Sequence, residues 1–111
     1  MALSENTSGS QTATVTTEHT LATISASGVY QLRVDLDNMA NGDITEIRIK
    51  VQPRSSPTTR LIEWYAVFAD DQGTDNQLVI SPPIPSVYSI EFTLKQTTGT
   101  GRAYAWSVLE Y

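Results

Sequence analysis

From about residue 20 onward, apolar and polar side chains alternate along the chain. A period of two places successive side chains on opposite faces of a β-strand, one face buried and the other in water. The pattern therefore predicts strands, and no segment has the spacing of an amphipathic helix. It is clearest in two segments: residues 29–36, with Tyr30, Leu32, Val34 and Leu36 inward, and residues 46–52, with Ile47, Ile49 and Val51 inward.

Turn-forming residues separate the alternating segments. Residues 37–43 contain Asp, Asn and Gly, which tolerate turn and left-handed conformations, and predict a β-hairpin between the two strands just described. Residues 97–101 predict a second hairpin, between strands 87–96 and 102–110, with Tyr88 among the inward residues. Three prolines in residues 82–85 predict an extended connection, because proline fixes its own backbone and removes a ladder donor.

The segment Arg60–Ala69 departs from simple alternation because both of its faces are apolar or aromatic. Trp64 and Phe68 share one face, while Tyr65 and Val67 share the other. Two interpretations follow: a central strand covered on both sides, or a strand whose outer face meets a partner.

With a strand at residues 20–25, a short strand at 77–80 and one in the N-terminal segment, about eight short strands are expected. Regular spacing with turn residues between strands favours an antiparallel β-sandwich or a closed barrel, and an eight-stranded jelly roll in particular. A length of 111 residues fits one core. We therefore predict an all-β fold with an extended N-terminal arm at residues 1–18 and a single β-sandwich domain at residues 19–111.

The predicted arm is rich in Ser and Thr and poor in large aliphatic residues. Such a segment buries too little apolar surface to order by itself, so we expect it to become ordered only against a partner. Its alternating stretch around Thr14, Val15 and Thr16 is a candidate strand for addition to the partner's sheet edge.

Charge and composition narrow the choice of partners. A formal net charge of -5 and a pI near 4.6 disfavour nucleic acid and anionic membrane, which are bound through clustered Lys and Arg. No apolar run approaches the length of a membrane span, and the first basic residue is Arg33, so we expect synthesis in the cytoplasm without a secretory signal. The absence of cysteine excludes disulfides and thiolate metal sites.

Candidate catalytic chemistry is sparse. The single histidine, His19, has no partner in a recognisable pattern, and no nucleophile elbow or phosphate-binding glycine loop occurs. Two acidic loops do not match the spacing of a calcium loop, so we expect their carboxylates to be solvated turn residues. We therefore predict a protein that is not an enzyme, with no cofactor and no metal site. The acids concerned are Asp70, Asp71 and Asp75 around Gly73, and Asp35, Asp37 and Asp43.

Most of the aromatic residues fit the inward pattern of a small β core. Tyr65 and the terminal Tyr111 lie outside it. An exposed aromatic ring on a β surface serves either as an anchor in a protein interface or as a platform on which a sugar stacks. Tyr65 and Tyr111 therefore join Thr14, Val15 and Thr16 as candidate interface residues.

Two stretches resemble small virion proteins encoded by tailed phages and prophages: residues 28–43 running into 46–49, and residues 92–102 together with 106–109. The resemblance spans residues 28–109, and its motifs are structural rather than catalytic. It implies a jelly-roll head decoration, or cement, protein on the outside of an icosahedral capsid. It further implies a homo-oligomer, either a trimer or a dimer, bound to the major capsid protein at capsomer junctions.

A carbohydrate- or receptor-binding module of a phage tail or spike is the alternative function. It requires an exposed aromatic platform beside polar side chains, for which Tyr65 and the loop at residues 70–76 are candidates. A small hydrolase is a third possibility, and it requires converging ionisable groups that the sequence does not provide.

Overall fold

A computed structural model of the chain describes residues 3–70 and 78–111. The described residues form nine β-strands, and among them no helix long and apolar enough to cross a membrane occurs. The strands are β1 (Ser4–Thr12), β2 (Glu18–Ile24), β3 (Gly28–Asp35), β4 (Ile44–Val51), β5 (Leu61–Ala69), β6 (Leu78–Ile80), β7 (Ile84–Ser86), β8 (Ile90–Thr98) and β9 (Ala103–Glu110).

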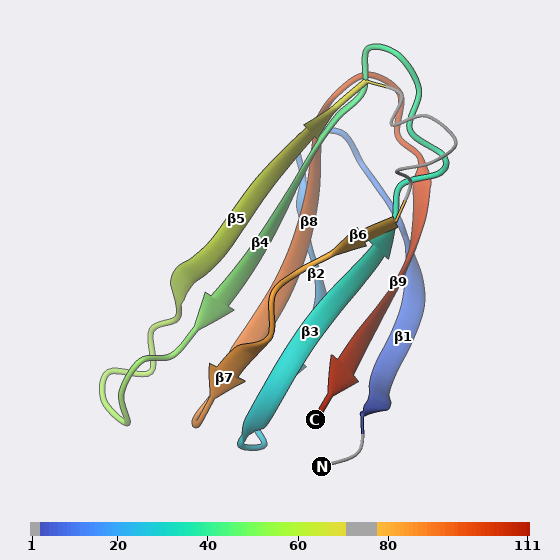
Figure 1. Cartoon of the computed structure of the whole chain (residues 1–111). Coiled ribbons are helices and arrows are strands. Elements are labelled where there is room, and N and C mark those ends of the chain that lie inside the picture. Colours follow the sequence, from blue (N-terminus) through green and yellow to red (C-terminus); the bar gives the residue numbers. More distant parts are fainter. Residues whose placement is uncertain (1–2, 71–77) are drawn as a thin grey trace.

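Two antiparallel sheets pack face to face (Figure 1). Sheet A has the order β1-β9-β3-β6, with β7 also paired to β3, and sheet B has the order β2-β8-β4-β5. β6 and β7 pair with opposite ends of β3, so together they occupy one strand position. Each sheet thus has four positions, and the chain passes repeatedly between the sheets. The prediction of an all-β sandwich with jelly-roll architecture is confirmed.

Neither predicted hairpin forms. β3 lies in sheet A and β4 in sheet B, and β8 and β9 are divided between the sheets in the same way. The turn residues at 37–43 and 99–102 carry the chain from one sheet across to the other. An alternating pattern shows which face of a strand is buried, but it does not show which strand lies beside it, and this is why the prediction was wrong.

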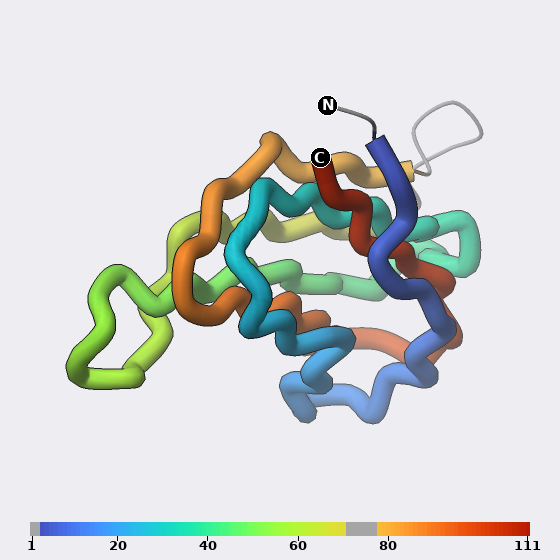
Figure 2. Tube along the Cα trace, turned by 90° about the horizontal axis from the view of Figure 1, so that it is seen from below, coloured from blue at the N-terminus to red at the C-terminus, as the bar shows by residue number. Residues whose placement is uncertain are grey.

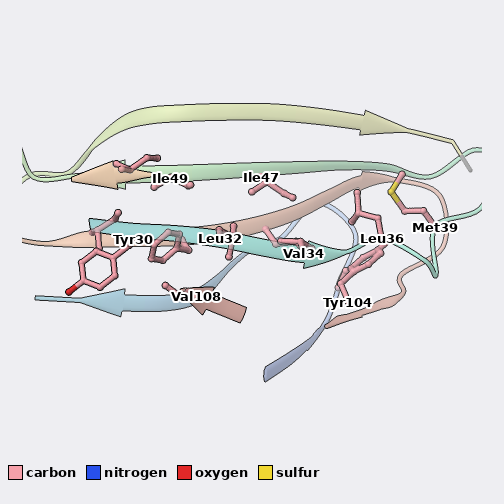
Figure 3. Close-up of a cluster of buried hydrophobic side chains, with 14 residues drawn as sticks. Tyr30, Leu32, Val34, Leu36, Met39, Ile47, Ile49, Tyr104 and Val108 are labelled. Atoms are coloured by element: carbon pink, nitrogen blue, oxygen red, sulfur yellow. The ribbon is translucent and has the colours of Figure 1, made fainter. Parts of the chain in front are cut away.

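The inward residues predicted from alternation meet between the two sheets, as Figure 3 shows for β3 and β4. Tyr30, Leu32 and Val34 of β3 face Ile47 and Ile49 of β4, and all five are at most 1% exposed. Burial of these side chains is the main source of stability for the sandwich. The other buried apolar residues are Ala13, Leu36, Met39, Ile84, Ile90, Phe92, Leu94, Tyr104 and Val108.

Residues 4–12 of the predicted arm belong to the sandwich. They form β1, which pairs antiparallel with β9 of the same chain from Ser4 opposite Glu110 to Thr12 opposite Ala103. The backbone bonds of the sheet edge, together with the close approach of Gly9 to the Trp106 ring, order this segment although its side chains are mostly exposed. The expectation that a partner is needed for ordering is therefore not met.

The proline-rich connection also differs in detail from the prediction. Ile84–Ser86 forms β7 against β3, and the next strand, β8, begins at Ile90 and not at Val87. Tyr88 consequently lies in the turn between β7 and β8 and is 40% exposed, although alternation placed it inward.

Candidate interaction surface

The apolar segment predicted at residues 60–69 forms β5, which is an edge strand of sheet B and not a central one. Its inner face is partly covered, since Trp64 and Phe68 pack against the core. Its outer face is open, with Tyr65 47% and Val67 50% exposed. Of the two interpretations left by the sequence, the covered central strand is wrong.

Most of the exposed apolar side chains belong to the edge strands on one side of the sandwich, and they project from the outer faces of both sheets. Figures 1 and 2 show β5, β6 and β7 together on this side, with β1 and β2 on the opposite side. We call β5, β6, β7 and the turn at residues 87–89 the open side. Among the described residues, ten large apolar side chains are exposed, and eight of them are on the open side: Leu61, Ile62, Tyr65, Val67, Leu78, Ile80, Val87 and Tyr88.

A groove of about 410 Å³ runs into the open side between the start of β5 and the end of β7. Most of its lining residues are apolar, and two are polar or charged. The lining residues are Val51, Gln52, Pro53, Leu61, Ile62, Glu63, Pro85 and Val87. Val87 is the most exposed of the large apolar side chains, at 62%. A solvent-facing apolar groove of this kind is typical of a surface that binds another molecule.

The four sheet edges differ in how well they are protected from pairing with another chain. β1 is polar along its whole length, with the sequence SENTSGSQT, and β2 is largely polar. β6 is three residues long, and β7 contains Pro85. Shortness, proline, charged side chains and bulges hinder the addition of a further strand, and the pairings of both β1 and β2 contain a bulge. β5 has nine residues, no proline and a single charge, Glu63, which lies at a bulge near its start.

Charges beside β5 are paired with one another. On the outer face of sheet B, Arg48 binds Glu46 at 2.6 Å, and Lys50 binds Glu18 at 2.7 Å. The hydrogen bond from Lys50 holds the pKa of Glu18 below its ordinary value, against the opposing effect of burial. The Arg48 guanidinium also lies 4.8 Å from the centre of the Tyr65 ring. One face of this ring therefore contacts a cation, which leaves less of it for a sugar.

A second hollow, of about 400 Å³, lies over the outer face of sheet A. Its lining is more varied and includes Glu5, Arg33, Asp35 and Trp106. The groove on the open side has one charged lining residue, Glu63, where the second hollow has three, so it is the better match to a protein-binding surface, because the centres of protein interfaces are depleted of charged residues.

The interface residues predicted from sequence fall in three separate places. Thr14, Val15 and Thr16 lie in the turn between β1 and β2, where Thr16 has a φ of 73° and the Thr17 amide donates to the Thr14 carbonyl. They form a turn and not the predicted strand. Tyr111 lies at the end of β9, and its hydroxyl donates to Gln31 at 2.6 Å. Only Tyr65 is on the open side.

His19 closes the turn between β1 and β2. The Thr14 amide donates to its Nε2 atom at 3.0 Å, which requires that nitrogen to be unprotonated, and its Nδ1 atom lies 3.2 Å from the Gln11 amide. The ring is partly buried and has a structural role. Among the described residues, no group of three or more His, Asp or Glu side chains is placed to hold a metal ion.

Asp43 is the exception among the acidic turn residues, since it is 1% exposed and not solvated. Its carboxylate accepts hydrogen bonds from the Ala40 amide at 3.0 Å, the Thr100 amide at 3.1 Å and Arg102 Nε at 2.9 Å. Burial alone would raise its pKa, but these three donors outweigh burial and hold the pKa below its ordinary value. In the other acidic loop, Asp71 and Asp75 lie outside the described residues.

A comparison with protein-family models, curated proteins and solved structures found no match to this chain. The fold and the surface therefore carry the functional interpretation. The sequence predicted Tyr65 as an interface residue and placed Val67 on the same face, for which contact with a partner was one of the two interpretations, but it missed the exposed residues of β6 and of the turn at residues 87–89. The signal for the residues of β5 is that both faces of residues 60–69 are apolar. The sequence places Val87 and Tyr88 in a strand, but in the structure that strand, β8, begins only at Ile90.

Proposed function

We propose that this chain is a structural protein of a phage virion, a capsid decoration or cement protein that binds the outer capsid surface and reinforces the junctions between capsomers. The open side is the observation that supports it, because a jelly roll with exposed apolar side chains on an edge strand and an adjoining groove is suited to contact other protein subunits. The resemblance of residues 28–109 to such virion proteins supplies the context.

The physical role of such a protein is to shift an equilibrium. A ligand that binds only the assembled lattice adds its binding free energy to the stability of that lattice. Many copies on one particle make weak individual contacts sufficient, particularly when copies are linked to one another. The net charge of -5 fits a protein partner better than the packaged nucleic acid.

The test is to mix purified protein with undecorated heads of the phage that encodes it. We expect co-sedimentation and greater resistance of the heads to heat. Val87→Asp should abolish both effects, because it places a charge at the most exposed apolar position of the groove. Leu3→Asp is the matched control, since Leu3 is 54% exposed but lies outside the open side. Wild-type protein that stays in the supernatant would contradict the proposal.

The alternative, a carbohydrate- or receptor-binding module of a tail or spike, predicts a different result. Isolated protein would then bind glycans on an array and would not sediment with heads. The contact between Arg48 and the Tyr65 ring weighs against a sugar platform at that position.

A further inference from the structure

His19 joins the edges of the two sheets on the side of the sandwich that is opposite the open side (Figures 1 and 2). It lies on β2 of sheet B, and its ring contacts Gln11 of β1 in sheet A and Thr14 in the turn between these strands. β1 pairs with β9, and β2 pairs with β8, so no backbone ladder joins β1 to β2. The ring therefore links two sheet edges through its side chain alone.

The hydrogen bond from Thr14 fixes the protonation state of the ring. The Thr14 amide is a donor, so Nε2 of His19, 3.0 Å away, must offer a lone pair. A neutral ring then has its proton on Nδ1, which lies 3.2 Å from the Gln11 side-chain amide, a group that can turn its oxygen to that proton. A positively charged ring has a proton on both nitrogens. Protonation of the ring and the bond from Thr14 therefore exclude each other.

We propose that His19 is a pH-sensitive link, which holds the turn at residues 13–17 to β2 while its ring is neutral and releases the turn when the ring takes up a proton. Histidine is the side chain that ordinarily changes its charge between pH 5 and 8. A proton on Nε2 sets two donors against each other, and the Thr14 amide then turns to water, which reaches it because Thr14 is exposed. This inference concerns the isolated chain and does not depend on the proposed function.

The linked turn contains a strained residue. Thr16 has a φ of 73°, a left-handed conformation that is unfavourable for a β-branched residue and persists only where surrounding contacts hold it. Those contacts include the bond from the Thr17 amide to the Thr14 carbonyl at 3.0 Å and the bond from the Thr16 amide to the Gln96 carbonyl at 2.7 Å. Loss of the bond from Thr14 to the ring removes a further contact, so we expect release to loosen the turn.

The charged side chains beside the ring on sheet B lie on the other face of that sheet. His19 is directly opposite the buried Leu94 of β8, and residues directly opposite each other share a face. Glu18 and Lys95, the next pair in the ladder, therefore project outward. Glu18 is bound there by Lys50 of β4 at 2.7 Å.

On the side of sheet A, the titratable groups near the turn have their own partners or lie at a distance along the strand. Tyr104 of β9 lies opposite Gln11, and burial raises the pKa of its hydroxyl. Arg102 binds Asp43 at 2.9 Å, and Glu5, the charged residue of β1, lies near the other end of that strand. Asp, Glu, Tyr, Lys and Arg ordinarily keep their charge states between pH 5 and 8, so the ring is the group at this edge that changes.

NMR of the wild-type protein at about pH 7.5 and at about pH 5 tests the link, because histidine ordinarily titrates between these values. The ¹⁵N chemical shifts of the ring report its protonation state, and we expect a neutral ring with its proton on Nδ1 at the higher pH. The protection of the Thr14 amide, corrected for the intrinsic effect of pH on exchange, should fall roughly threefold to tenfold at the lower pH, as expected for one lost hydrogen bond. A ring that stays neutral at the lower pH would overturn the proposal, and so would a Thr14 amide whose protection is unchanged when the ring is charged.

His19→Gln separates the effect of the ring from that of every other group. Glutamine gains no charge in this range, and its oxygen can still accept a hydrogen bond, so the fold should be retained. We expect the protection of Thr14 in this variant to be the same at both pH values. The chain has one histidine and no cysteine, and the terminal amino group is common to both proteins, so a difference between them is due to the ring. The same pH dependence in the variant as in the wild type would overturn the proposal.

Glu18→Gln is the matched control. It makes a similar change at the neighbouring residue of β2, but on the outer face of sheet B, where Glu18 binds Lys50. We expect this variant to keep the wild-type pH dependence of the Thr14 amide. If Glu18→Gln instead removes that dependence as fully as His19→Gln does, the effect belongs to the charges on the outer face, and the proposed link is wrong.

Discussion

At the scale of single residues, Asp43 is a buried acid that links two connections, although its position in a turn predicted a solvated side chain. Its carboxylate accepts a hydrogen bond from the Ala40 amide of its own loop. It also accepts hydrogen bonds from the Thr100 amide and the Arg102 side chain, which lie in the connection between β8 and β9. The same connection is held by Gln96, whose amide donates to the carbonyl of Thr100 at 2.7 Å. One buried acid thus joins the two connections that pass between the sheets at this end of the sandwich.

Replacing Asp43 should therefore be costly. Asp43→Asn keeps the size of the side chain but removes the charge that accepts three donors, and we expect the free energy of unfolding to fall by about 2 kcal/mol. Urea denaturation at neutral pH measures this change. Asp37→Asn, at an exposed position in the same loop, is the control and should have little effect. Equal stability of the two variants would show that the Asp43 cluster contributes nothing.

The lowered pKa of Asp43 gives this contribution a defined pH dependence. The folded chain binds this proton less readily than the unfolded chain, whose carboxyl has the ordinary pKa of 3.8. The stabilisation is therefore complete above that value and is lost as the pH falls through the folded pKa. The stability difference between wild type and Asp43→Asn should shrink on acidification into that range. A difference that stays constant would contradict the assignment.

Substitution of Gly99 and of Gly42 distinguishes the cost of backbone strain from the cost of a steric collision. Both have positive φ angles, 95° and 93°, in connections that meet at Asp43. A Cβ atom at Gly99 would collide with Asp43, whereas at Gly42 it would meet nothing within 4 Å. We expect Gly42→Ala to cost about 1 kcal/mol from the backbone alone, and Gly99→Ala to cost about 3 kcal/mol or more because crowding is added. Thermal denaturation of the two variants compares them directly, and equal losses would exclude the collision.

At the scale of strands, the sequence identifies buried faces better than neighbours. The alternation in β3 correctly separates Leu32 and Val34, which are buried, from Arg33 and Asp35, which are exposed. The same residues cannot show that β3 pairs with β9 and not with β4, because either neighbour would bury the same face. The jelly-roll class followed from the number and spacing of strands, whereas the pairing depends on contacts between distant parts of the chain.

The edge strand β1 is a case in which the side chains gave no sign of a strand that the structure contains. Its composition is that of a mobile segment, yet backbone pairing with β9 and the close contact of Gly9 with Trp106 place it in sheet A. Edge pairing depends on the backbone, so it leaves no apolar signal in the side chains. Of the candidate site, only the face of β5 with Tyr65 and Val67 could be recognised. The exposure of the other apolar residues depends on which strands lie at an edge, and the sequence does not show this.

Hydrogen exchange on the isolated protein tests the pairing of β1. The amides of Ser4–Thr12 that donate to β9 should exchange slowly, in alternation with fast amides that point to the free edge. The turn at residues 14–17 should show at least one slow amide, since Thr16 donates to the carbonyl of Gln96 at 2.7 Å. Uniformly fast exchange through residue 12 would restore the view that this segment orders only against a partner.

At the scale of the whole molecule, two features act in opposite directions on self-association. The open side has eight of the ten exposed large apolar side chains among the described residues, which favours contact between copies. The net charge of -5 on each copy opposes it, because the copies repel one another at neutral pH. The balance between the two terms depends on salt, since salt screens the repulsion but not the apolar and backbone contacts.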